Sequence, residues 1–141
     1  MTTLIQDIKN QPIDCVIFSD FDETYKPSGR SDVSSGIEEL EETLIELSHQ
    51  YHILFGWVTG SNLKNIQKKM EKYTRFPPHF IASSLGTEIH WFQNGQFIDD
   101  RAWNRHIKSC NDIDVLSKMF KALAQEKNIH LELQPPQYQG K

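Results

Sequence analysis

The sequence predicts an α/β fold in which helices flank a mostly parallel sheet that is extended by a β-hairpin. Three short apolar runs, typical of buried strands, alternate with two segments of helical periodicity. Each run leads directly into polar or acidic residues, which is typical of the carboxyl ends of parallel strands. The chain has 141 residues and no internal repeat, so we expect one domain.

The first apolar run covers residues 15–18 and predicts a buried strand. Cys15 lies in this run and is expected to be a small core residue. A helix should follow, because Ser35 and Glu38 have the spacing of a capping box. The apolar positions of this helix are Ile37, Leu40, Leu44 and Leu47.

The second apolar run covers residues 51–58 and predicts another buried strand, which ends at Thr59-Gly60-Ser61. Ser61 is expected to cap a second helix. This helix should end before the pair Pro77-Pro78. The apolar positions of that helix are Leu63, Ile66, Met70 and Tyr73. Its lysines, at positions 64, 68, 69 and 72, are expected to form the solvated face.

The third run covers residues 79–82 and ends at Ser83-Ser84-Leu85-Gly86. The pair Asn94-Gly95 then separates two further extended segments and predicts a hairpin. A third helix is expected from Asp112 or Asp114 to about Gln125, with its apolar positions at Val115, Leu116, Met119 and Leu123. A last strand is predicted over residues 129–133, where apolar and polar residues alternate.

Composition narrows the classes of partner. The formal net charge is −4, so the chain lacks the overall positive charge of a nucleic-acid or anionic-membrane binder. No apolar stretch has the length of a membrane span, and no signal peptide is visible at the N-terminus. Two cysteines are too few for a disulfide scaffold. We therefore expect a reduced, cytoplasmic protein without nucleic-acid or membrane partners.

The segment Asp20-Phe21-Asp22-Glu23-Thr24 directly after the first strand is the strongest candidate for chemistry. Two carboxylates that leave a strand end on the same side repel each other unless a cation lies between them or one takes a proton. Such a pair suits Mg²⁺ binding, or a division of work in which one acid attacks and the other moves a proton. A solvated acidic loop is the alternative interpretation of this segment.

The residues after the second and third strands could contribute to the same site. Thr59 offers a hydroxyl, Gly60 allows close approach of the backbone, and the next helix begins there with free N–H groups. These features indicate a phosphate site, although an ordinary helix cap would look the same. Glu88 could contact a polyhydroxy substrate, or it could simply be solvated. The six histidines show no metal-ligand spacing.

These motifs resemble a known family. Asp20-Phe21-Asp22-Glu23-Thr24 resembles the first motif of the haloacid dehalogenase-like (HAD) phosphohydrolases, and Thr59-Gly60 resembles the second. Residues 81–89 are similar to a loop of the sucrose-phosphatase and Cof-type branch of that family. The resemblance implies a Rossmann-like core and a Mg²⁺-dependent phosphatase whose substrate is a small phosphorylated sugar, such as a hexose 6-phosphate.

The resemblance also implies a role for each matching residue. Asp20 would be the nucleophile that forms an aspartyl-phosphate, and Asp22 would be the general acid and base. Mg²⁺ would be bound by the carboxylate of Asp20 and the backbone carbonyl of Asp22. Thr59 and the amide of Gly60 would hold phosphate oxygens, and Thr24 would steady the first loop of the phosphate site.

The chain departs from the family pattern in its later part. The family's third motif is a lysine and its fourth is an acidic pair, and both normally follow an inserted cap domain. We find no late strand that ends in an acidic pair. On this resemblance we expect residues 1–141 to correspond to the N-terminal part of a HAD-like core, without the cap domain and the C-terminal core motifs. On this basis the chain alone is expected to be weakly active or inactive.

A non-catalytic interpretation stays open beside the enzymatic one. The chain could be a phosphate-binding or regulatory α/β module, including a truncated and inactive phosphatase. A receiver domain of this class would carry a phosphate-accepting aspartate at the end of its third strand. Here that strand ends in Ala82-Ser83-Ser84, which counts against a receiver. The sequence leaves the identity of the sugar and the oligomeric state open.

Overall fold

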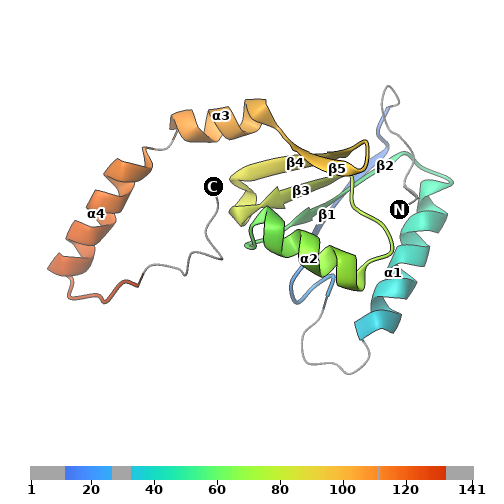
Figure 1. Cartoon of the computed structure of the whole chain (residues 1–141), viewed down its shortest axis with the longest axis horizontal. Helices are drawn as coiled ribbons and strands as arrows, with labels where there is room; N and C mark the ends of the chain where they lie inside the picture. The colour runs from blue at the N-terminus through green and yellow to red at the C-terminus, as the bar shows by residue number, and fades with distance from the viewer. Residues whose placement is uncertain (1–11, 27–32, 111, 133–141) are drawn as a thin grey trace.

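A computed structural model describes residues 12–26, 33–110 and 112–132, with the side chains of residues 33–35 and 113 excepted. The elements are β1 (Cys15–Asp20), α1 (Val33–Ser48), β2 (Ile53–Val58), α2 (Leu63–Tyr73), β3 (Phe80–Ser83), a short 3₁₀ turn (Ser84–Gly86), β4 (Glu88–Gln93), β5 (Gln96–Asp99), α3 (Arg101–Cys110) and α4 (Ile113–Glu126). Figure 1 shows one sheet with α1 and α2 beside it and with α4 extending away from it.

The five strands follow one another across the sheet in chain order. β1, β2 and β3 are parallel, whereas β4 and β5 add an antiparallel hairpin after β3. The hairpin turn has positive φ at both Asn94 (51°) and Gly95 (82°), which is the conformation that this residue pair favours. The predicted α/β class, the parallel strands and the hairpin are therefore confirmed.

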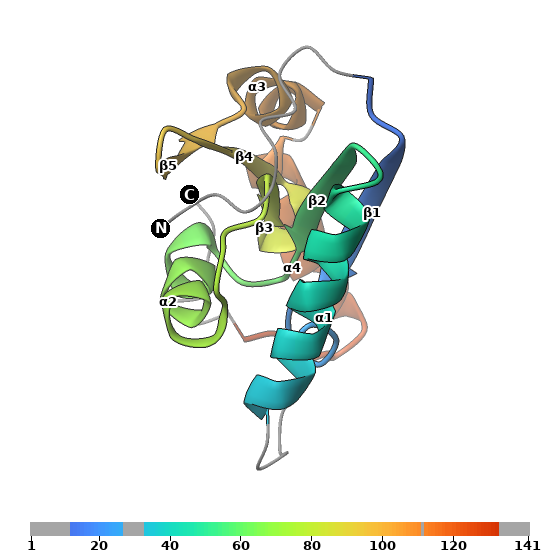
Figure 2. The same cartoon turned by 90° about the vertical axis from the view of Figure 1, so that its right-hand side faces the viewer.

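The core lies between one face of the sheet and the helices α1 and α2. Trp57 of β2, Ile37 of α1 and Ile66 of α2 are all fully buried in it. Both helices therefore cover the same face, as two crossovers that progress in one direction across a sheet require (Figure 2). The arrangement leaves the carboxyl ends of β1, β2 and β3 free at one edge.

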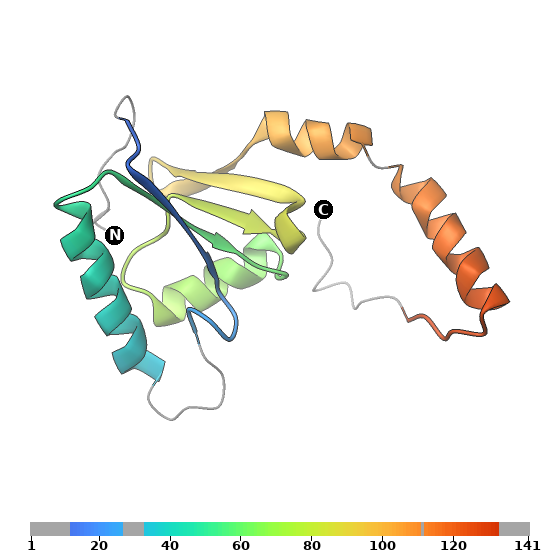
Figure 3. The same ribbon diagram turned by 180° about the vertical axis from the view of Figure 1, so that it is seen from behind.

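The first strand is more exposed than its apolar sequence predicts. Within the described residues β1 pairs only with β2, so it lies at the edge of the sheet, as the rear view in Figure 3 shows. Phe18 is 64% exposed, and Cys15 is exposed and not part of the core. The prediction of a buried strand with Cys15 inside was wrong, because β1 is an edge strand and no described element covers the face that carries Phe18.

Two helix predictions need correction, and one helix was not predicted. α1 begins at Val33, two residues before the predicted capping position at Ser35. α2 is capped by the side chain of Asn62, which accepts from the Asn65 amide at 3.0 Å, and not by Ser61. The sequence interpretation missed α3, whose first turn is capped by Asp100 through the Ala102 and Trp103 amides at 3.0 and 2.9 Å.

The C-terminal part of the described chain matches its prediction only in the helix. α4 is confirmed with Asp112 as its cap, where the side chain accepts from the Val115 amide at 3.1 Å. Residues 129–132 form no strand; Ile129 and Leu131 are more than half exposed and pair with none of the described strands. Residue 133, the end of the predicted strand, lies outside the described residues. Among the described helices none has the length and apolar character needed to cross a bilayer.

A close approach between β2 and β3 makes Gly56 a sensitive position. A Cβ atom there would lie 2.1 Å from Cζ of Phe80, whose ring is buried against Trp91. We expect Gly56→Ala to lower the free energy of unfolding by about 1–3 kcal/mol, because the ring must move in a packed site. Chemical denaturation of the variant measures this. Adding Phe80→Leu should recover part of the loss, and an unchanged stability of Gly56→Ala would contradict the packing.

Candidate active site

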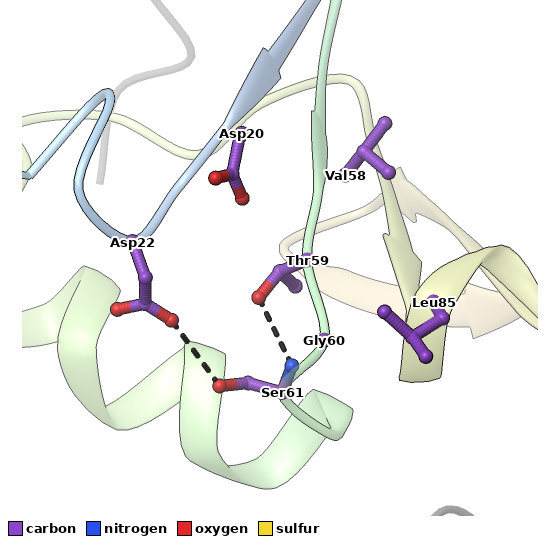
Figure 4. A pocket seen from close by; sticks show the side chains of 7 residues that line it. All are labelled: Asp20, Asp22, Val58, Thr59, Gly60, Ser61 and Leu85. Carbon is purple, nitrogen blue, oxygen red and sulfur yellow. Dashed lines mark hydrogen bonds between the residues drawn. The ribbon is translucent and has the colours of Figure 1, made fainter.

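The ends of β1 and β2 and the turn after β3 line a pocket of about 690 Å³. Its lining residues are Asp20, Asp22, Val58, Thr59, Gly60, Ser61 and Leu85. Figure 4 shows both aspartates on one side of the pocket and the Thr59–Ser61 segment on the other. Four of the predicted site residues, Asp20, Asp22, Thr59 and Gly60, are thus brought together.

The loop that carries the two aspartates is folded back on the end of β1. The amide of Tyr25 donates to the carbonyl oxygen of Asp20 at 3.0 Å, and the amide of Lys26 donates to that of Phe21 at 2.8 Å. Phe21 is fully buried, so the residue between the two acids anchors the loop in the core. Glu23 turns the chain with φ of 66°, a left-handed conformation that glycine adopts more easily.

Buried contacts hold this loop against the core. The ring of Tyr25 packs on Phe21 and Trp57, and its hydroxyl donates to Oε1 of Glu41 at 3.1 Å. The same carboxylate, which is fully buried, accepts from the Arg75 amide at 3.0 Å. Burial raises the pKa of Glu41, although the hydrogen bonds from Arg75 and Tyr25 oppose that shift. Burial, together with the charge of Glu41, raises the pKa of the Tyr25 hydroxyl.

The Thr59–Ser61 segment is a fixed turn opposite the aspartates. The amide of Thr59 donates to the Ala82 carbonyl oxygen at 3.0 Å, and the Thr59 carbonyl oxygen accepts from the Leu85 amide at 3.0 Å. The hydroxyl oxygen of Thr59 accepts from the Ser61 amide at 3.0 Å. Gly60 is exposed at the tip of this turn. Backbone and side-chain donors of this turn could hold an anion that enters the pocket.

The carboxylates of Asp20 and Asp22 have different surroundings. Among the described residues, that of Asp20 makes no hydrogen bond with another side chain or amide. That of Asp22 lies 2.6 and 2.7 Å from Nζ of Lys69, and accepts from the Ser61 hydroxyl at 3.4 Å. Lys69 was predicted to be an ordinary solvated lysine, and that was wrong. Lys69 follows Asn62 by two helical turns, so both residues lie on the same side of α2. This spacing could have indicated where Lys69 lies.

Two predicted site residues do not line the pocket. Thr24 is exposed in the loop after Asp22. Glu88 lies at the start of β4 and accepts from the hydroxyls of Ser83 and Ser84 at 3.2 and 3.4 Å. Ser83 also contacts the buried His90 at 3.0 Å, so Glu88 belongs to a polar cluster beside the pocket. The predicted roles of Thr24 and Glu88 stay predictions.

The donor set of the pocket fits Mg²⁺. This ion is typically held by one or two carboxylates, by substrate phosphate oxygens and by several waters. Asp20 supplies an exposed carboxylate, and Asp22 follows it two residues later at the same pocket. No group of three or more His, Cys, Asp or Glu side chains suited to a metal occurs in the described part of the chain. Asp20 and Asp22 are the acidic residues that line the pocket, and they are the ones that would hold the ion.

Comparison with known proteins gives one consistent result. Residues 13–141 match the family of sucrose-6F-phosphate phosphohydrolases. Over 122 residues the chain is 39% identical to kanosamine-6-phosphate phosphatase of Bacillus subtilis (strain 168), covering 84% of this chain and 43% of that enzyme. An uncharacterized hydrolase of Staphylococcus aureus (strain N315) is 26% identical over 96 residues, which are 67% of this chain and 35% of that protein.

The fold has a solved counterpart. The crystal structure of a haloacid dehalogenase-like hydrolase from Bacillus subtilis matches with a TM-score of 0.61 and 39% identity, over 86% of this chain and 45% of that one. The chain thus spans less than half the length of the relatives that it matches.

Proposed function

The chain belongs to the haloacid dehalogenase-like sucrose-phosphatase family, and we propose that it carries the nucleophile and phosphate site of a Mg²⁺-dependent sugar-phosphate phosphatase. One observation carries the proposal: Asp20 and Asp22 share a pocket with the Thr59–Ser61 turn. A nucleophile and a proton-transferring group on one strand end would thereby face the anion site on the next.

In the proposed reaction a carboxylate oxygen of Asp20 attacks the phosphorus atom of the substrate. The bond between phosphorus and the sugar oxygen breaks, and Asp22 gives a proton to the departing alkoxide. Asp22 then takes a proton from water, which attacks the phosphorus of the aspartyl-phosphate. Inorganic phosphate leaves, and both aspartates return to their starting states.

The remaining parts of the pocket would hold the phosphoryl group in place. The hydroxyl of Thr59 and the amide of Gly60 would bind its oxygens, so that the phosphorus faces Asp20. When bound at Asp20 and the Asp22 carbonyl, Mg²⁺ supplies positive charge against the repulsion between a carboxylate and a phosphate dianion. Thr24 would steady the loop from its exposed position.

We assign the substrate class as a hexose 6-phosphate. Its support is the 39% identity to an enzyme named for kanosamine 6-phosphate, together with the match to the sucrose-phosphate phosphohydrolases. Glu88, beside the pocket, would accept hydrogen bonds from the sugar hydroxyls. A non-catalytic phosphate-binding module is the competing function, since the described residues offer only these two acids at the pocket.

Phosphate release tests the proposal. The chain is incubated with a panel of hexose 6-phosphates, including kanosamine 6-phosphate, either with Mg²⁺ or with a chelator. We expect slow release that requires Mg²⁺ and differs among the sugars. Binding of inorganic phosphate without release from any substrate would instead support the non-catalytic module.

A further inference from the structure

The side chain of Lys69 connects two parts of the pocket that are far apart in the sequence. It projects from α2, and its ammonium group lies 2.6 and 2.7 Å from the two carboxylate oxygens of Asp22, 47 residues earlier. Both side chains are partly buried, with 32% and 39% of their surfaces exposed. Because the contact involves both oxygens, it restrains the orientation of the carboxylate and also balances its negative charge.

Ser61 completes a triangle with these two groups. Its hydroxyl donates to Asp22 at 3.4 Å, and the ammonium group of Lys69 donates to the hydroxyl oxygen of Ser61 at 3.4 Å. Ser61 directly follows the Thr59-Gly60 turn, and its amide donates to the Thr59 hydroxyl oxygen. The carboxylate of Asp22 is therefore tied to the same segment that would hold the phosphate.

We propose that Lys69 is a positioning residue that holds the Asp22 carboxylate on the Ser61 side of the pocket. Figure 4 shows the carboxylate of Asp22 turned toward the hydroxyl of Ser61. The inference rests on the proposed function, in which Asp22 transfers the proton. Two neighbouring carboxylates compete for the same cation and repel each other. Lys69 neutralises Asp22, so that Asp20 remains the carboxylate available to the metal and to phosphorus.

We expect the fold not to depend on this ion pair. A partly exposed pair contributes little to stability, so Lys69→Met should fold normally. Lys68→Met is the matched control, because Lys68 is exposed on the same helix. Lys69→Arg keeps the positive charge and is the rescue variant.

The leaving group of the substrate distinguishes positioning from a general loss of charge. A sugar alkoxide needs a proton to depart, whereas p-nitrophenolate departs without one. In Lys69→Met we expect kcat for a hexose 6-phosphate to fall about 10- to 100-fold, within the range of general acid catalysis, with KM nearly unchanged. The kcat for p-nitrophenyl phosphate should fall far less, and Lys69→Arg should recover part of the loss.

A measurement without turnover tests the contact itself. In NMR spectra of the ¹⁵N-labelled chain, an ammonium group held by a carboxylate exchanges slowly with water and gives a resolved cross-peak. We expect such a peak for Lys69 in the wild-type chain and in Lys68→Met, and its loss in Asp22→Asn. This result can be obtained even if the chain releases no phosphate, so failure of the proposed function and failure of this inference are distinguishable.

Two results would overturn the inference. One is the absence of the Lys69 cross-peak in the wild-type chain, or its persistence in Asp22→Asn. The other is an equal fall in kcat for the sugar phosphate and for p-nitrophenyl phosphate, which would show that Lys69 acts on the phosphate rather than through Asp22.

Discussion

Replacing Asp20 by asparagine is expected to lower the rate of Mg²⁺-dependent phosphate release by a factor on the order of 10³ or more. The amide cannot attack phosphorus, and it is a much weaker ligand for Mg²⁺. The side chain of Asp20 is exposed and makes no hydrogen bond among the described residues. The substitution should therefore leave the fold intact, and circular dichroism and thermal unfolding check this.

The matched control for that experiment is Asp114→Asn. Asp114 is an exposed acid in the first turn of α4, and it does not line the pocket. Its replacement changes the net charge by the same amount as Asp20→Asn, and it should leave phosphate release unchanged. Equal activity of the wild-type chain and Asp20→Asn would exclude Asp20 as the nucleophile.

The largest effect on stability is expected at Glu41. In Glu41→Ala the buried hydroxyl of Tyr25 and the Arg75 amide both lose their acceptor, and a cavity remains. We expect the free energy of unfolding to fall by about 3 kcal/mol, since each unpaired buried donor costs about 1–3 kcal/mol. Denaturant unfolding measures the loss. Glu42→Ala is the control, because Glu42 is exposed and its contact with Arg75 at 3.5 Å is a surface ion pair.

The pH dependence of stability provides a second test at the same residue. Burial raises the pKa of folded Glu41 above its ordinary value of 4.5. Its contribution to stability is then fully present below about pH 4.5 and is lost as the pH rises through the folded pKa. We expect the stability of the wild type relative to Glu41→Gln, which cannot ionise, to decrease as the pH is raised above 4.5. A difference that stays constant or increases over this range would contradict the raised pKa.

Local patterns in the sequence were sufficient for most of the sheet. The hairpin followed from Asn94-Gly95, because few other residue pairs accept positive φ at two successive positions. The convergence of Asp20 with Thr59 followed from the rule that parallel strands end at one edge. The hairpin prediction holds because it depends on the backbone conformation of two neighbouring residues, and the convergence holds because the rule applies to any pair of adjacent parallel strands.

Features that depend on distant parts of the chain could not be predicted in the same way. An apolar strand gives no indication of whether an element covers it, and so the exposure of Phe18 was not foreseen. The role of Lys69 depends on a loop 47 residues earlier, which its helix alone does not reveal. α3 was missed because Asp100 ends the hairpin and also caps the helix, which leaves no separate boundary signal.

The covalent intermediate is the most direct test of the central claim that Asp20 is phosphorylated. The Asp22→Asn variant is mixed with p-nitrophenyl phosphate and Mg²⁺, quenched in acid, and digested for mass spectrometry. The nitrophenolate leaving group needs no proton, so the aspartyl-phosphate can still form. Its hydrolysis lacks the base that Asp22 provides, so the aspartyl-phosphate should accumulate. We predict the added mass of one phosphoryl group on the peptide that contains Asp20. In the double variant that also carries Asp20→Asn, we predict no added mass on this peptide. Release of nitrophenol without a phosphoryl group on Asp20 would contradict the account.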